Sequence, residues 1–174
     1  PKAPAFLETE RLNELLQRRA RVAQAVGNKS FLILFSGEPR VYANDVDYPF
    51  RQENNLFYLT HLKQAGATLV VLPGNTQFPE ILFLPKRSPL AETWTGHMYS
   101  AQEAQQISGV KEIWNAAELD PFLRSIRNRQ PYRPKAENIL LSDLPASFEF
   151  HNGHGFEPLF AAAADDAAGV FMLV

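Results

Sequence analysis

Residues 45–62 read DVDYPFRQENNLFYLTHL and form the most distinctive stretch of the chain. Aromatic residues are dense in it, and they surround one arginine, Arg51, and one glutamine, Gln52. Aromatic side chains bury large areas, and a buried arginine must be paired or hydrogen-bonded. The composition of this stretch therefore indicates either a specific core or the wall of a site.

The sequence around this stretch alternates between helix-like and strand-like patterns. Apolar residues at helical spacing predict a helix over residues 9–26, and SAQE, which begins at Ser100, is a capping box that starts another. A Pro-Gly-Asn turn predicts a hairpin between the strands 67–72 and 80–84. Other short strands are expected at 31–35, 41–43, 57–59, 110–114 and 138–141. This order predicts an α/β fold with a mixed β-sheet flanked by helices.

The bulk composition excludes several classes of protein. The chain has 174 residues, a size that suits one domain with its own core, and its net charge is −2. The run RRARV at 18–22 is interpreted as a solvated helix face, so no basic cluster is expected to bind nucleic acid. There is no cysteine and no apolar run of membrane-spanning length. We therefore expect a cytoplasmic protein without nucleic-acid or membrane partners.

Four motifs follow one another along the chain: YPFRQ at 48–52, LFYLTHL at 56–62, ILFLPKR at 81–87 and WTG at 94–96. In this order and spacing they resemble the N-terminal domain of the Xaa-Pro aminopeptidase (aminopeptidase P), prolidase and creatinase family. The resemblance implies a mixed sheet with a ribonuclease-H-like topology. The chain departs from the family at His61, where glycine is usual.

The expected organisation has three parts. Residues 1–8 form an N-terminal arm, and residues 9–145 form the creatinase/prolidase N-terminal-like domain. Residues 146–174 form a tail or linker toward a C-terminal metallopeptidase domain that this chain does not contain. The last residues, FMLV at 171–174, have the pattern of a strand that is cut short, which suggests a fragment.

The resemblance also implies substrate-side residues. Trp94 matches a tryptophan that lies on a loop beside the active-site cleft in the family, and Gly96 keeps the turn. The alternative interpretation of Trp94 is a half-buried aromatic residue that only anchors a loop. Asp45, or else Asp47, matches an acidic residue that reaches a neighbouring subunit's active site and meets the substrate's amino end. A carboxylate suits a protonated amine, although either aspartate is also a good turn residue that caps its own backbone.

Two further residues belong to the same expectation. His97 stands where arginine is common in the family, and it is placed either in the cleft, titrating near neutral pH, or on the surface. Arg51 is interpreted as architectural, holding its loop through Asp47, Asp45 or backbone carbonyls.

The resemblance implies the following function. Whole family members remove the N-terminal residue from peptides with proline second, or cut Xaa-Pro dipeptides, with two divalent metals, often manganese, in a C-terminal domain. This chain itself is expected to carry no catalytic residue, metal ligand or cofactor. It is interpreted as a noncatalytic N-terminal domain that walls the cleft and mediates oligomerisation. Its partners are then the peptide substrate, the peptidase domain and further copies of itself.

Two alternatives stay open. One is a free-standing binding or assembly module of the creatinase type. The other is a small metal site in HNGHGFE, where His151, His154 and Glu157 are spaced by three residues as on one helix face. Gly153 and Gly155 argue against a helix there, and a polar loop is the plain interpretation.

Overall fold

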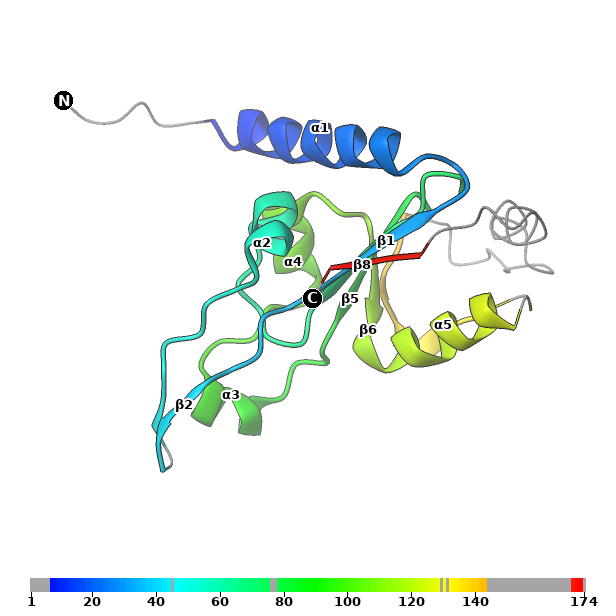
Figure 1. Cartoon of the computed structure of the whole chain (residues 1–174). Coiled ribbons are helices and arrows are strands. Elements are labelled where there is room, and N and C mark those ends of the chain that lie inside the picture. Colours follow the sequence, from blue (N-terminus) through cyan, green and yellow to red (C-terminus); the bar gives the residue numbers. More distant parts are fainter. Residues whose placement is uncertain are drawn as a thin grey trace.

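A mixed β-sheet of six strands forms the centre of the chain as far as the structure describes it (Figure 1). The computed structural model describes residues 7–44, 46–75, 78–128, 130, 132–143 and 170–173, and the side chains of residues 46, 47, 94, 95 and 170–173 lie outside that description. In spatial order the strands are β7 (Ile139–Leu141), β6 (Glu112–Asn115), β5 (Glu80–Leu84), β4 (Thr68–Val71), β1 (Phe31–Phe35) and β8 (Val170–Leu173).

Antiparallel pairing of β1, β4 and β5 makes the middle of the sheet. Leu69 lies opposite Leu82, so the expected hairpin is confirmed. The two strands outside this meander, β6 and β8, run parallel to β5 and β1, and β7 closes the far edge antiparallel to β6. The predicted fold class, a mixed sheet flanked by helices with a ribonuclease-H-like topology, is confirmed.

Both faces of the sheet are covered, which explains why the strands are continuously apolar. In β1 alternate residues point to opposite faces: Leu32 and Leu34 join one buried cluster, while Phe31 and Ile33 join the other. The first cluster lies under α1 (Glu8–Val26), α2 (Asn54–Thr60) and α4 (Ala101–Ser108), and the second under α5 (Leu119–Arg127). Full burial of each large apolar side chain contributes roughly 1.5–3 kcal/mol.

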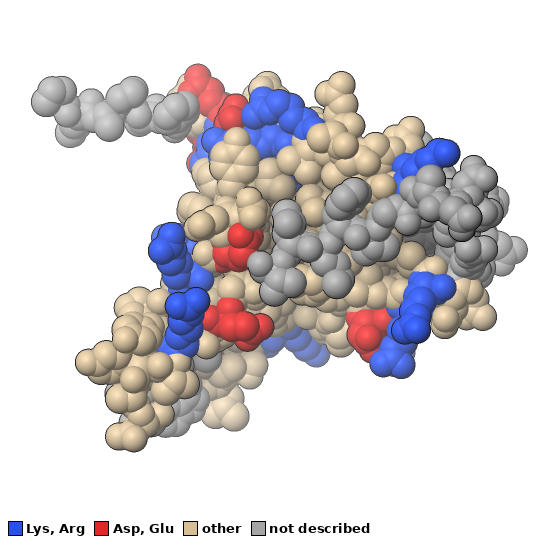
Figure 2. Space-filling view, viewed as in Figure 1, with Lys and Arg blue, Asp and Glu red and all other residues tan. Residues whose placement is uncertain are grey.

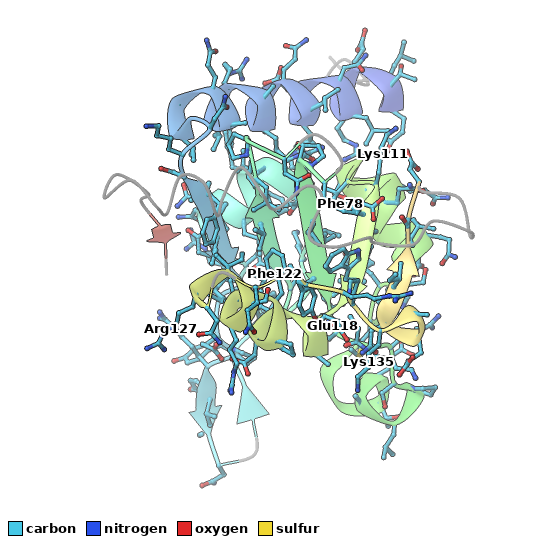
Figure 3. All side chains as sticks on the ribbon, turned by 90° about the vertical axis from the view of Figure 1, so that its right-hand side faces the viewer. Phe78, Lys111, Glu118, Phe122, Arg127 and Lys135 are labelled. Atoms are coloured by element: carbon cyan, nitrogen blue, oxygen red, sulfur yellow. The ribbon has the colours of Figure 1, made fainter. Side chains whose placement is uncertain are left out.

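Two small elements lie at one end of the molecule, away from α1 (Figures 1 and 3). One is a two-stranded antiparallel ribbon of β2 (Val41–Ala43) and β3 (Val46–Asp47), and the other is the helix α3 (Pro89–Thr95). Two short 3-10 turns, η1 (Ala116–Glu118) and η2 (Ala136–Asn138), complete the described elements. The ribbon and α3 therefore mark one end of the domain.

The strand expected at 57–59 is wrong, because this segment lies in α2. The Glu53 side chain caps the helix by accepting the Leu56 N–H at 2.8 Å. Leu56, Leu59 and Thr60 then share one buried face at helical spacing. His61 ends the helix in the left-handed conformation, with φ of 57°, and its ring stacks on Phe57 at 5.2 Å.

The solvated interpretation of residues 18–22 is wrong for Arg19, which is 1% exposed. On the face drawn in Figure 2, described basic and acidic side chains lie interspersed. Among the described helices, none combines the length and apolarity that crossing a bilayer requires.

Candidate functional site

Two buried glutamines join the two motif-bearing parts of the chain, residues 45–62 and 92–104. Gln52 Oε1 accepts the N–H groups of Gly37 and Glu53, each at 2.9 Å, and its Nε2 donates to the Gln64 carbonyl at 3.0 Å. Gln64 Oε1 in turn accepts the Tyr99 N–H at 3.0 Å. The YPFRQ segment and the α3–α4 connection are thus held by one hydrogen-bonded chain.

Gly37 allows the backbone to come close enough for this arrangement. A Cβ placed on Gly37 would lie 2.8 Å from the Arg51 carbonyl oxygen, which is closer than real side chains approach. Glycine is therefore required where the chain leaves β1 for the ribbon.

The local sequence explains the short helix α3. Ser88 caps it, with Oγ accepting the Ala91 N–H at 3.4 Å, and Pro89 occupies the first turn. Gly96, with φ of 83°, ends it. Trp94 therefore lies within a helix, and the expectation of a loop at this position is wrong; its side chain is outside the description.

Glu92 fastens both ends of α3. Its Oε1 accepts from Arg87 Nε and from the Met98 N–H, both at 2.9 Å. The Met98 N–H and then the Arg87 guanidinium hold the pKa of Glu92 below its usual value, because both stabilise the carboxylate. The segment from Arg87 to Met98 is thus closed into a loop by one carboxylate.

His97 lies between two carboxylates on the surface of this segment. Its Nδ1 is 3.5 Å from Glu92 Oε1, and its Nε2 is 3.2 Å from Glu103 Oε1. Glu103 also completes the capping box with Ser100, whose N–H and then hydroxyl lower the Glu103 pKa. The His97 side chain is 51% exposed, so its imidazole is available to a partner at this end of the domain.

The ribbon presents aromatic side chains to solvent. Tyr42 and Tyr48 are 65% and 52% exposed, and their rings pack edge to face with centroids 5.0 Å apart. Asp45 lies outside the described residues. Asp47 pairs with Val41 through its backbone in β3, and its side chain is outside the description.

Arg51 is exposed at the base of the ribbon. Its Nη2 donates to Asn54 Oδ1 at 3.4 Å. The expected partners Asp45 and Asp47 have no described side chains, so the architectural role of Arg51 stays a prediction. Gln52, its neighbour in the same motif, has the larger described network.

Sequence reasoning missed Gln52, Gln64 and Glu92 as organising residues. The available signal was weak: Gln52 is a polar side chain inside an aromatic run, and buried polar groups must find partners. Gln64 and Glu92 carry no such local signal, because their partners are distant in the sequence or depend on how α3 ends.

The described groups at this end are two carboxylates, an imidazole and exposed aromatic rings. Glu92 and Glu103 already accept hydrogen bonds within the domain. Within the described ranges, no three His, Asp or Glu side chains are grouped so that they could hold a metal ion. His151, His154 and Glu157 lie outside the described residues, so that alternative site is untested.

Comparisons with a family sequence model and with known proteins all identify relatives in one family. The sequence model of the aminopeptidase P N-terminal domain matches residues 15–133. The Xaa-Pro aminopeptidase of Haemophilus influenzae is 35% identical over 113 residues, covering 65% of this chain and 26% of that protein. Xaa-Pro aminopeptidase 3 of Homo sapiens is 30% identical over 126 residues, covering 70% and 24%.

A solved structure has the same fold. Aminopeptidase P from E. coli with the inhibitor Pro-Leu superposes with a TM-score of 0.58 at 24% identity, covering 64% of this chain and 26% of that one. The chain thus spans about a quarter of the length of the relatives it matches.

Proposed function

Because the chain belongs to the aminopeptidase P N-terminal domain family, we propose that it is the noncatalytic N-terminal domain of a Xaa-Pro aminopeptidase-like peptidase. The observation that carries this proposal is the match over residues 15–133, which includes both motif-bearing stretches. The much greater length of the relatives supports a catalytic domain beyond the part of the protein that this chain represents.

The domain's contribution is to wall the substrate cleft. The ribbon and α3 lie at one end of the domain, so they are suited to face a neighbouring catalytic domain together (Figure 1). Trp94, His97 and either Asp45 or Asp47 are the proposed substrate contacts, with the carboxylate meeting the peptide's amino group. Enclosing the substrate fixes its position and excludes bulk water from the reaction.

The chemical step belongs to the downstream domain. Two divalent metals, with manganese as the first candidate, are proposed there, and they would supply an activated water for attack on the peptide. The proposed substrate is a peptide with proline second. The presence of Pro-Leu as an inhibitor in the E. coli relative supports a site that accepts prolyl peptides.

Oligomerisation and location are part of the same proposal. The exposed Tyr42 and Tyr48 give the ribbon an apolar surface suited to a second copy of the protein. Residues 9–145 are proposed as the main part of the folded unit and 146–174 as the connection toward the peptidase domain, and β8 within that connection adds a strand to the sheet beside β1. A cytoplasmic location is part of the proposal, and the chain, which has no cysteine, needs no disulfide to fold there.

The test is the size and activity of the native product. An antibody raised against this domain is used on lysates of source cells, with a gene-deleted lysate as control. We expect a band more than twice the 19.6 kDa of this chain, and manganese-dependent release of the first residue from an Xaa-Pro peptide. A band at 19.6 kDa would overturn the proposal and favour a free-standing module.

A further inference from the structure

We propose that Gln52 and Gln64 are positioning residues, which couple the β2–β3 ribbon to the α3–α4 connection and so fix the two substrate-facing segments relative to each other. The consequence for catalysis rests on the proposed function. The coupling itself depends only on the hydrogen bonds and burial of the two glutamines.

Both side chains are placed where only a satisfied amide is tolerated. Gln52 is 6% exposed and Gln64 is 7% exposed, although glutamine is mostly a surface residue. A buried amide that loses a partner leaves an unsatisfied polar group, which destabilises the folded chain. The pair is therefore expected to hold its geometry firmly.

The bonds reach separate parts of the chain. The Gly37 N–H lies between β1 and the ribbon, and the Glu53 N–H lies between the ribbon and α2. Gln52 Oε1 thus accepts hydrogen bonds from the segment that leads into the ribbon and from the segment that leaves it. The absence of a side chain at Gly37 keeps this contact close.

The link to α3 runs through Gln64. Its main-chain carbonyl accepts a hydrogen bond from Gln52 Nε2, while its side-chain Oε1 accepts one from the Tyr99 N–H. The neighbouring Met98 N–H is bonded to Glu92 in α3. Movement at the ribbon base would therefore either break these hydrogen bonds or move the segment that follows Trp94 as well.

This arrangement matters for a substrate that touches both segments. Loss of a binding interaction that is made equally in the ground state and in the transition state raises KM and leaves kcat unchanged. A bridge at the common base of two such segments sets their separation without touching the substrate. Its loss should weaken substrate binding rather than the chemical step.

The test uses the protein encoded by the complete gene, with two replacements that keep side-chain size. Gln52→Met removes the side-chain bonds to Gly37, Glu53 and the Gln64 carbonyl. Gln64→Met removes the side-chain bond to the Tyr99 N–H and keeps the main-chain carbonyl that accepts from Gln52. Gln102→Met, at an exposed position on α4, is the matched control.

The first readout is hydrogen exchange of individual amides. In Gln52→Met we expect the Tyr99 amide, which Gln52 does not touch, to exchange about tenfold faster, the size expected for about 1.4 kcal/mol. In Gln64→Met the Gly37 amide should respond in the same way. Changes confined to amides bonded directly to the replaced side chain would overturn the coupling.

The second readout is kinetic, on an Xaa-Pro peptide. Each Met variant should raise KM about five- to tenfold with kcat within about twofold, and the double variant should be little worse than either single one. Gln102→Met should resemble the wild type. Fully additive KM effects, or an equal rise in KM from Gln102→Met, would overturn the positioning role.

The two readouts separate this inference from the proposed function. If the wild-type protein does not cleave Xaa-Pro peptides, the proposed function fails, while the exchange at Tyr99 and Gly37 still decides whether the bridge couples the segments.

Discussion

Arg19 Nε donates to Glu80 Oε2 at 2.7 Å, so a buried ion pair ties α1 to the start of β5. The same guanidinium donates from Nη1 to the carbonyls of Leu59 and Ser108, at 2.9 Å each. These carbonyls lie at the C-terminal ends of α2 and α4, where a positive charge is favourable. One side chain thus fastens three helices to the sheet.

Replacement of Arg19 by methionine should therefore destabilise the chain strongly. We expect a loss of about 3 kcal/mol in the free energy of unfolding, because Glu80 loses its partner and two helix ends lose their donor. Urea denaturation measures this loss. Arg124→Met is the control, since its ion pair with Asp120 is exposed and should contribute less than about 1 kcal/mol. Equal losses in the two variants would contradict the prediction.

Ser100 should be the more important of the two serine caps near the site. Ser100→Ala removes both the bond to the Glu103 N–H and the bond to the Glu103 carboxylate, and should cost about 1 kcal/mol. Ser88→Ala removes a longer single cap bond, at 3.4 Å, and should cost less. Thermal unfolding of both variants gives the comparison. The reverse order would show that the capping box contributes little.

His61 should make stability depend on pH. Burial lowers its pKa below the usual 6.5, and the charges of Arg11 and Arg18 lower it further. As pH falls through 6.5 the unfolded chain takes up the proton before the folded one, so the stabilisation by neutral His61 is complete above that pH and is lost below it.

The measurement is urea unfolding at about pH 7.5 and about pH 5.5, on the wild type and on His61→Asn. Asparagine tolerates the left-handed conformation but does not titrate. The wild type should lose more stability on acidification than the variant does. Parallel losses would assign the pH dependence to other groups.

Trp94→Ala tests the proposed wall of the cleft. In the protein encoded by the complete gene, we expect kcat/KM on an Xaa-Pro peptide to fall by about tenfold or more, with circular dichroism unchanged. Leu90→Ala is the control, because Leu90 is 76% exposed on the same helix. Turnover that is unchanged in Trp94→Ala would remove this residue from the site.

Much of the fold could be predicted because its signals are local. FLILF has the continuous apolar pattern of a strand that is covered on both faces. SAQE contains both residues of a capping box within four positions. The strand predicted at residues 57–59 is wrong because aromatic residues favour strands, whereas the Glu53 cap and the burial of Leu59 stabilise a helix.

The contacts that organise the core around Arg19 and the site around Gln64 could not be predicted from local patterns. Arg19 looks like one of several surface arginines until α2, α4 and β5 surround it. Gln64 acquires its role only when Tyr99 lies beside it. These contacts depend on tertiary structure, and no spacing within either segment reveals them.

The pairing of β8 with β1 also has a consequence for synthesis. β1, β4 and β5 all leave the ribosome long before β8, so the outer edge of β1 stays unpaired until β8 has been made. An exposed strand edge is a template for pairing with another chain. The nascent protein therefore has an interval in which it is prone to aggregate, and that interval ends only when β8 emerges and pairs with β1.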